Sequence, residues 1–348
     1  MISIARLRIP LAMAVLGMAA SLATQVALAE TGSEQTSMME KCLLDNMQTA
    51  KPDTTVAKLR QNCEQSVAKT GAKDDQTLQE EPLTPVQQRM FDDQINYDRQ
   101  YIISTFRPNY FMATYNDDPN NEPFYPITDG EDVLNRGEAK FQVSFKAPLW
   151  RNIGGTNNDL LGAYTSTSWW QIGNDDDEAS SAFRETNYEP EIFLRHYAEN
   201  MEIFGGKVRA FDLGVNHQSN GRSQLLSRSW NRVMGRAYID WGDVAVALRA
   251  WYRIPEDDDD DDNKYMYRYY GAGDVTVVWA PNKNTFSAMI RPGTEENGLE
   301  FTWSYPVTKI LRVYAQYWNG YGESLLDYNV RTERIGIGIA LNDWIDRR

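Results

Sequence analysis

Alternation of apolar and polar residues along short segments is the sequence feature that most restricts the fold of this chain. From about residue 107 onward, runs in which every second residue is apolar are separated by turn residues. A period of two is the pattern of a β-strand with two different faces. Twelve segments of this kind are predicted: 109–116, 138–147, 161–172, 191–199, 208–217, 231–240, 244–254, 265–279, 285–291, 298–305, 310–318 and 333–342.

The connections between these segments are sorted by length. Those after even-numbered segments are mostly short, whereas those after odd-numbered segments are often long and polar. The long ones are 117–137, 173–190, 218–230, 255–264 and 319–332. Outer-membrane barrels have short turns at one end and long loops at the other, and an even number of strands permits closure. The predicted fold class is therefore all-β, a twelve-stranded antiparallel transmembrane β-barrel, although connection 148–160 is longer than this scheme requires.

The composition agrees with a barrel that has a polar interior and an apolar outer wall. In segment 231–240, Arg232 and Arg236 share one face while small and aliphatic residues occupy the other. Ten Trp, nineteen Tyr and twelve Phe are consistent with aromatic girdles. A soluble aromatic-rich β protein has the same composition but no reason to sort its loops. The net charge of −14 and the lack of a basic stripe argue against nucleic acid as a partner.

The N-terminal part of the chain reads as a targeting segment followed by an extension. Arg6 and Arg8 precede an apolar stretch, and Ala27-Leu28-Ala29 has the form of a signal-peptidase site. We predict a signal peptide over 1–29, a short, helical periplasmic extension and linker over 30–90, and the barrel over 91–348. Cys42 and Cys63 lie in the extension, where an oxidising compartment favours a disulfide over a metal site.

One polar stretch, Asn216–Arg232, contains the residue types of a nucleophilic catalyst. His217 and Ser219 continue the outward-facing set of segment 208–217, and Asn231 begins the outward-facing set of the next segment. In an antiparallel hairpin, His217 and Asn231 become near-opposite neighbours, with Cβ atoms about 4.5–5.5 Å apart. The serine, the imidazole and the amide would then lie on one lipid-facing surface at the rim with the long loops.

This arrangement predicts hydrolysis of an acyl ester in a lipid. Ser219 would attack the ester carbonyl, His217 would accept and return the proton, and Asn231 would orient the imidazole. Surface loops are often rich in Ser, Asn and Arg, so His-x-Ser alone indicates little. The other histidine, His196, is interpreted as a structural residue without such partners.

The same loop offers oxygen ligands for a cation. Carbonyl and hydroxyl oxygens of Gly221, Arg222, Ser223 and Ser227 are hard donors suited to Ca²⁺. A bound cation would stabilise the developing oxyanion. The six aspartates 257–262 are interpreted instead as a solvated loop, because the run has no spaced glycine to build a rigid calcium turn.

Several long motifs resemble the outer membrane phospholipase A family, in matching order over roughly residues 107–345. The active-site segment is matched by Asn216-His-Gln-Ser-Asn-Gly-Arg-Ser223 and Ser227-Arg-Ser-Trp-Asn-Arg232. Further matches are Ser168-Trp-Trp-Gln171, Phe183-Arg-Glu-Thr-Asn-Tyr-Glu-Pro190, Lys264-Tyr-Met266, Ser304-Tyr-Pro-Val-Thr-Lys309, Gly320-Tyr-Gly-Glu-Ser-Leu325 and Leu341-Asn-Asp343.

The resemblance implies a calcium-dependent phospholipase of the bacterial outer membrane that hydrolyses sn-1 and sn-2 ester bonds, faces the outer leaflet and is activated by homodimerisation. It implies that His217, Ser219 and Asn231 are catalytic. It also implies Ca²⁺ ligands at Arg222, through its carbonyl, and at Ser227. Ser180 of the partner subunit would complete the calcium site, with Ser181 as the neighbouring possibility.

Two other functions compete with this prediction. A passive outer-membrane channel would have a non-catalytic polar rim and would conduct ions continuously. An outer-membrane protease would need acidic residues and His in a barrel cleft, a pattern that the sequence does not display.

Overall fold

The computed structural model describes residues 83–97, 103–172, 183–257 and 261–345, together with Lys58, Arg60 and Cys63. Residues Leu83–Arg348 form one compact unit, separate from Met1–Pro82. The predicted signal peptide, Cys42 and nearly all of the extension lie outside the described residues, so they and the domain boundaries remain predictions. None of the helices among the described residues combines the length and the apolarity needed to cross a membrane.

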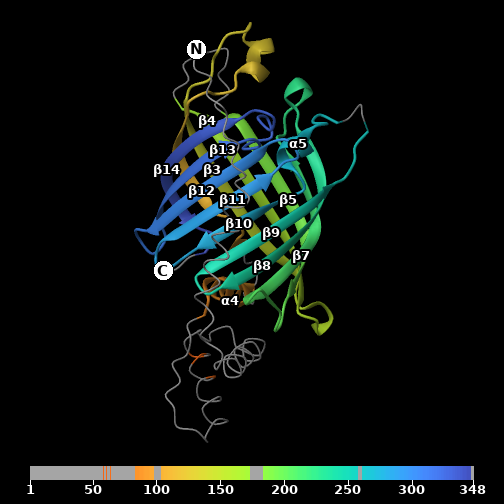
Figure 1. Cartoon of the computed structure of the whole chain (residues 1–348), viewed down its shortest axis with the longest axis vertical. Helices are drawn as coiled ribbons and strands as arrows, with labels where there is room; N and C mark the ends of the chain where they lie inside the picture. The colour runs from red at the N-terminus through yellow and green to blue at the C-terminus, as the bar shows by residue number, and fades with distance from the viewer. Residues whose placement is uncertain are drawn as a thin grey trace, which may run out of the picture. The chain divides into compact units, whose positions relative to one another are not determined.

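Twelve long antiparallel strands form a closed barrel, as the alternation predicts (Figure 1). The strands are β2 Asn109–Asn116, β3 Gly137–Trp150, β4 Asn158–Gln171, β5 Phe183–Tyr197, β7 Gly206–Ser219, β8 Ser229–Trp241, β9 Val244–Arg253, β10 Gly273–Trp279, β11 Thr285–Pro292, β12 Asn297–Pro306, β13 Arg312–Gly320 and β14 Thr332–Asn342. The barrel closes where β14 pairs with β2, with Ile337 opposite Ala113. Two-residue strands, β1 Ser104–Thr105 and β6 Glu202–Ile203, add to β3 and β7.

Two predicted segments differ from the structure. Residues Met266–Tyr270, predicted as the start of a strand, form the short helix α5, and β10 begins only at Gly273. Met266 and Tyr270 are buried in an aromatic cluster with Trp230 and Trp251, so packing decides the local conformation. Strand β5 starts eight residues before the predicted position because its first inward-facing residues are charged or polar and are satisfied inside the barrel.

The connection that is too long for the predicted scheme proves to be short. Strand β3 extends to Trp150 and β4 begins at Asn158. Between them, residues 151–157 form a short link that contains the 3-10 segment η2, Ile153–Gly155. The connection predicted over residues 148–160 is therefore one of the short turns at this end of the barrel.

The last strand illustrates the difference between the two faces of the wall. Ile335, Ile337 and Ile339 are exposed on the outside. Gly338 faces inward, and a Cβ at this position would lie 2.1 Å from the Phe111 carbonyl oxygen. The alternation of isoleucine and glycine thus combines an apolar outer surface with an interior that has little space.

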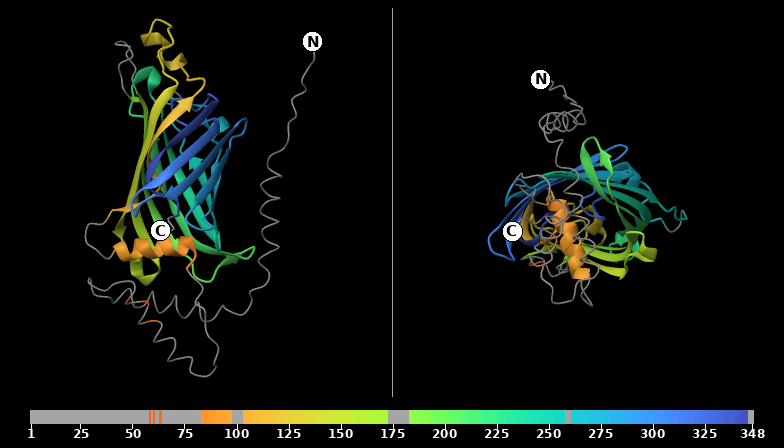
Figure 2. Two further views of the ribbon diagram at one scale, coloured as in Figure 1. Left: turned by 90° about the vertical axis from the view of Figure 1, so that its left-hand side faces the viewer. Right: turned by 90° about the horizontal axis from the view of Figure 1, so that it is seen from below.

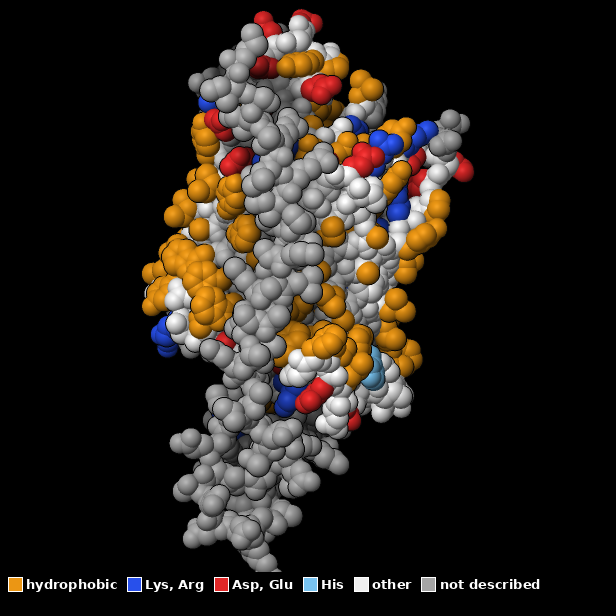
Figure 3. All heavy atoms as spheres, viewed as in Figure 1, with side chains coloured by type: hydrophobic (Ala, Val, Ile, Leu, Met, Phe, Trp, Pro, Cys, Tyr) orange, Lys and Arg blue, Asp and Glu red, His pale blue; other side chains and the backbone are white. Residues whose placement is uncertain are grey.

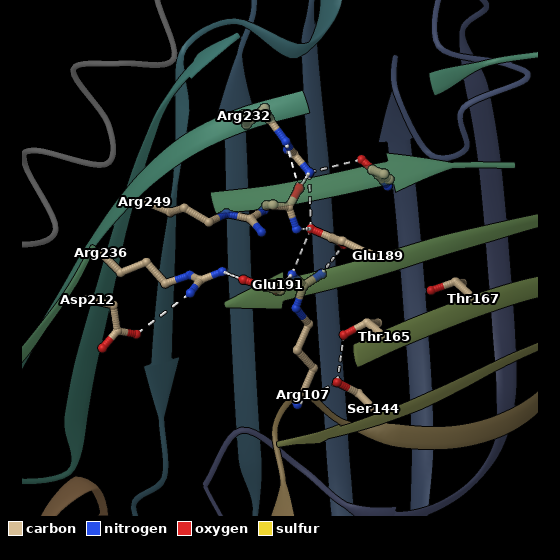
Figure 4. A network of polar contacts seen from close by, with 12 residues as sticks. Arg107, Ser144, Thr165, Thr167, Glu189, Glu191, Asp212, Arg232, Arg236 and Arg249 are labelled. Carbon is tan, nitrogen blue, oxygen red and sulfur yellow. Dashed lines mark hydrogen bonds and ion pairs between the residues drawn. The ribbon is translucent and has the colours of Figure 1, made fainter. Parts of the chain in front are cut away.

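Paired charges line the interior (Figure 4). Arg107 contacts Glu189 at 2.8 Å and Glu191 at 2.9 Å, and Arg232 contacts Glu189 at 3.1 Å. Arg236 contacts Glu191. This confirms the prediction that arginines confined to one face of a strand line a charge-paired interior.

Helix α4, Pro85–Tyr97, lies across the barrel end that carries the short turns (Figure 2). Arg89 donates hydrogen bonds to the carbonyl oxygens of Asp343 (2.9 Å) and Phe106 (2.8 Å). Thr84, just before the helix, donates to Asp240 at 2.6 Å. The helix is therefore tied to strand ends and to the segment after β14, which restricts passage through this end.

Replacing Glu189 with alanine is expected to destabilise the barrel by about 3–5 kcal/mol, because it removes the carboxylate that pairs with the buried Arg232, whereas Arg107 keeps its contact with Glu191. Glu333→Ala is the matched control, because Glu333 is an exposed strand residue that accepts a hydrogen bond only from the Tyr317 hydroxyl among the contacts described. Its loss should change stability by no more than about 0.5 kcal/mol. Urea unfolding in detergent measures both. Equal midpoints for the two variants would contradict the proposed role of the interior pairs.

Candidate active site

The predicted catalytic residues lie on one hairpin made by β7 and β8. The register places His217 opposite Asn231 and Ser219 opposite Ser229. His217 is exposed, and Ser219 and Asn231 are half-buried. Because His217 and Ser219 are two residues apart in a strand, their side chains leave the same face, which is the outer face of the barrel.

The imidazole is oriented by the asparagine. His217 Nδ1 lies 2.9 Å from Asn231 Oδ1. An amide oxygen only accepts, so Nδ1 carries the proton and Nε2 is left as the acceptor that a serine hydroxyl requires. Among the described residues no hydrogen bond joins Ser219 to His217; such bonds are often long in unliganded enzymes and tighten when substrate binds.

The second histidine is a useful comparison and requires a correction. We interpreted His196 as a structural residue without the serine and asparagine partners of His217, yet its Nδ1 lies 3.0 Å from Asn158 Oδ1 across the β4–β5 pair. A cross-strand His–Asn pair is therefore not diagnostic of catalysis. What distinguishes the pair of His217 and Asn231 is the serine two residues along on the same face.

The loop between β7 and β8 is organised by Asn220. Its Oδ1 accepts the backbone N–H groups of Arg222 (3.2 Å) and Arg228 (3.0 Å), and its Nδ2 donates to the Leu226 carbonyl at 2.8 Å. The backbone at Gly221 has a φ of 65°, which favours glycine. Asn220 thus draws the two ends of the loop together beside Ser219.

Two of the three predicted calcium ligands lie in this loop. Arg222 donates from its side chain to the Phe183 carbonyl oxygen at 2.9 Å. Ser227 donates to Asp262 at 2.5 Å, so a carboxylate adjoins the hydroxyl. Ser180 lies outside the described residues. In the described part of the chain no cluster of three or more His, Cys, Asp or Glu residues could hold a metal.

The wall below the site is apolar. Leu213 and Val215, which precede His217 on the same face of β7, are 63% and 53% exposed. Val233 and Tyr252 extend this surface onto β8 and β9. Hydrophobic side chains also cover large parts of the outer wall in the view of Figure 3. A hydroxyl nucleophile at the upper edge of such a surface is accessible to a lipid.

Sequence reasoning missed two residues that support the site, Asn220 and Glu256. Asn220 follows Ser219 directly and precedes Gly221. An asparagine before a glycine often marks a turn, and this signal could have pointed to Asn220. Glu256 accepts a hydrogen bond from Asn231 Nδ2 at 3.1 Å. It lies 25 residues after Asn231, at the start of an acidic run that otherwise reads as a solvated loop, and no spacing in the sequence points to it.

A family model described as Phospholipase A1 matches residues 86–341. The Phospholipase A1 of Escherichia coli strain K12 is 40% identical over 253 residues, which cover 71% of this chain and 84% of that protein. The Proteus vulgaris Phospholipase A1 is 39% identical over 249 residues, with coverage of 71% and 84%.

Solved structures of outer membrane phospholipases are similar to this chain in fold and sequence. The outer membrane phospholipase A from Escherichia coli superposes with a TM-score of 0.66 at 38% identity, covering 70% of this chain and all of that one. A Salmonella typhi outer membrane phospholipase, crystallised as a dimer with bound calcium, gives 0.66 at 38% identity and covers 71% and 94%. An asparagine-to-alanine active-site mutant of the Escherichia coli protein gives 0.65 at 37% identity, again covering 71% and 94%.

Proposed function

Since this chain belongs to the phospholipase A1 family, we propose that it hydrolyses the sn-1 and sn-2 acyl ester bonds of phospholipids by a Ser-His-Asn mechanism that depends on calcium and dimerisation. Family membership makes it an enzyme that acts on phospholipids, and its barrel and relatives locate it in the bacterial outer membrane. The observation that carries the mechanism is the 2.9 Å contact between His217 and Asn231, with Ser219 on the same outward face.

The reaction uses the three side chains in turn. As the Ser219 hydroxyl attacks the ester carbonyl, His217 Nε2 accepts its proton. The imidazolium then returns the proton to the leaving lysophospholipid oxygen, which leaves an acyl-enzyme. Water enters by the same route, with His217 as the base, and releases the fatty acid.

Asn231 holds the imidazole in the tautomer that this sequence requires. It stabilises the imidazolium less than a carboxylate would, because it carries no charge. The assignment is supported by the related Escherichia coli structure whose active-site mutation replaces an asparagine.

The donor set of the β7–β8 loop fits calcium, which prefers oxygen ligands. The Arg222 carbonyl and the Ser227 hydroxyl would hold the ion, with Asp262 beside Ser227 and Ser180 supplied by the partner subunit. The chemistry that calcium supplies when bound there is polarisation of the ester carbonyl. The calcium-bound dimer of the Salmonella typhi relative supports both the ion and the homodimer.

Dimerisation would serve as control. A lipase embedded in a membrane is surrounded by substrate, so a site that is complete only with a residue of a second subunit keeps isolated protomers idle. Thr84, next to α4, contacts Asp240 near the end of β8, whereas Asn231 lies near the start of that strand. The site therefore lies at the end of the barrel opposite α4 (Figure 2), which agrees with a site that faces the outer leaflet.

A hydrolysis assay tests this function against the passive channel. Phosphatidylcholine carrying different labels at sn-1 and sn-2 should release both fatty acids in detergent micelles with calcium. In planar bilayers the same protein should show no steady conductance, because paired charges project into the barrel and helix α4 lies across one of its ends. Steady conductance without fatty-acid release would favour the channel.

Replacing Asn231 with alanine should lower kcat by roughly ten- to a hundredfold without abolishing it, because the residue orients the base rather than reacting, and general-base catalysis as a whole contributes about 10²–10⁴-fold. Asn158→Ala is the control, because it removes the same amide from the pair with His196. The kcat values of the two folded variants are compared. Equal decreases in kcat would contradict a specific role for Asn231.

A further inference from the structure

We propose that Glu256 is a positioning residue of the active site, which fixes the Asn231 amide and supplies negative charge behind it. The inference rests on the proposed Ser-His-Asn mechanism and extends it by a fourth member. Glu256 Oε1 accepts a hydrogen bond from Asn231 Nδ2 at 3.1 Å, while Asn231 Oδ1 faces His217 Nδ1 at 2.9 Å. The three side chains form one continuous chain of hydrogen bonds that leads to the imidazole.

The carboxylate determines which end of the amide faces the histidine. The two ends of an asparagine amide have nearly the same shape, and either could point at an imidazole. An ionised carboxylate only accepts hydrogen bonds, so it holds the NH₂ group and turns the oxygen toward His217. The histidine must then donate from Nδ1, and Nε2 is left as the base for Ser219. If the amide rotated, its NH₂ would require the opposite tautomer, with the proton on Nε2.

Glu256 is positioned by a contact with Arg253 and by the backbone that precedes it. Arg253, the last residue of β9, contacts Glu256 Oε2 at 3.5 Å and is itself anchored by Asp261 at 2.6 Å and the Asn263 carbonyl at 3.0 Å. The backbone N–H of Ile254 donates to the Asn231 carbonyl at 2.8 Å, which joins the end of β9 to β8. The Glu256 side chain is 18% exposed, so its charge is only partly screened by water.

The second His–Asn pair shows what the carboxylate adds. Asn158 Nδ2 donates to neutral groups of Thr156, the carbonyl at 3.1 Å and the hydroxyl at 2.6 Å. The pair of His196 and Asn158 thus has an oriented amide but no charge behind it, and no proposed nucleophile beside it. At the proposed active site, the Glu256 carboxylate lies two hydrogen bonds from the His217 ring. Its negative charge stabilises the imidazolium formed during the reaction, which compensates in part for the neutral charge of Asn231.

Steady-state kinetics of Glu256→Gln and Glu256→Ala test the inference. Both variants should lose about tenfold in kcat with KM unchanged, because the lost interaction strengthens in the transition state rather than in the substrate complex. Asp257→Asn is the matched control, since it removes one negative charge from the adjacent, exposed position and should keep wild-type kcat. Equal losses in Glu256→Gln and Asp257→Asn would overturn the specific role.

A double substitution separates positioning from a merely structural effect. In an Asn231→Asp background the new carboxylate faces Glu256, and the two negative charges repel. Glu256→Gln should therefore raise kcat in that background while lowering it in the wild type, whereas loss of a structural contact lowers kcat in both. A decrease in both backgrounds would overturn the proposal.

The tautomer of His217 gives a readout that needs no substrate. The chain has only two histidines, so ¹⁵N-labelled imidazole signals in detergent are readily assigned with a His196→Gln variant. Wild type should show the proton on Nδ1 of His217, and Glu256→Ala should show a mixture of both tautomers. If Glu256→Ala keeps both the wild-type tautomer and the wild-type kcat while Ser219→Ala is inactive, the positioning role of Glu256 is overturned and the mechanism stands. An active Ser219→Ala would instead overturn the mechanism on which it rests.

Discussion

Replacing Ser219 with alanine is expected to reduce phospholipid hydrolysis by roughly 10⁴-fold or more, since loss of the nucleophile in a hydrolytic triad has an effect of this order. Ser219 is half-buried at the end of β7. The loss of one hydroxyl should leave the barrel intact, and binding of substrate to the apolar wall should persist. Release of labelled fatty acid from mixed micelles measures the effect over this range.

The matched control for this variant is Ser229→Ala. Ser229 is the cross-strand neighbour of Ser219 at the start of β8, so the same atom is removed from the same rim of the barrel. Its kcat should remain within a few-fold of wild type, and a long-chain sulfonyl fluoride should still modify the enzyme at Ser219. Full activity in Ser219→Ala, or equal inactivation by both substitutions, would refute Ser219 as the nucleophile.

The arrangement of the predicted site could be derived from the sequence because a strand has a fixed period. Counting by twos through β7 places His217 and Ser219 on the face of Leu213 and Val215, and the hairpin brings Asn231 opposite His217. These relations depend only on the alternation and on antiparallel pairing. The closed barrel follows from the same alternation and from the order of the connections.

Features decided by tertiary packing could not be derived in this way. The start of β5 contains Arg184 and Glu185, which are polar by any sequence criterion and are buried only because partners from other strands and loops surround them. Helix α5 has an aromatic composition typical of strands, yet Met266 and Tyr270 pack into a cluster that continues the barrel core. The contact of Glu256 with Asn231 depends on the path of the loop after β9, for which the period of a strand gives no information.

The physical setting gives a reason for the proposed orienting roles of Asn231 and Glu256. Asn231 lies on the outer face of the barrel, above exposed apolar residues. An aspartate at this position would place a full charge beside lipid, which is unfavourable. A neutral amide avoids that cost, and Glu256 places the charge one hydrogen bond further away, beside Arg253.

Removal of calcium is expected to abolish hydrolysis, because the predicted site depends on an ion to stabilise the oxyanion and loss of such stabilisation costs about 10²–10³-fold per donor in hydrolases. Activity in excess EDTA should therefore fall by at least that factor and return when calcium is added. Ser227→Ala should shift the calcium dependence to higher concentration without changing the limiting rate greatly, since the Arg222 carbonyl remains. Rates that are unaffected by the chelator would remove calcium from the mechanism.

Two measurements distinguish an ion at this site from a general effect of calcium on the membrane. Ser229, at the start of β8, directly follows the loop and is not one of the candidate calcium donors. The calcium titration of Ser229→Ala should therefore overlay that of wild type, whereas that of Ser227→Ala should not. Chemical cross-linking of wild type should increase when calcium and a substrate analogue are added together, because a ligand from a second subunit couples ion binding to association. Ser180→Ala should weaken that increase while leaving cross-linking without calcium unchanged. Identical titrations for Ser229→Ala and Ser227→Ala would contradict a site in the β7–β8 loop. Cross-linking that does not depend on calcium would contradict completion of the site by the partner subunit.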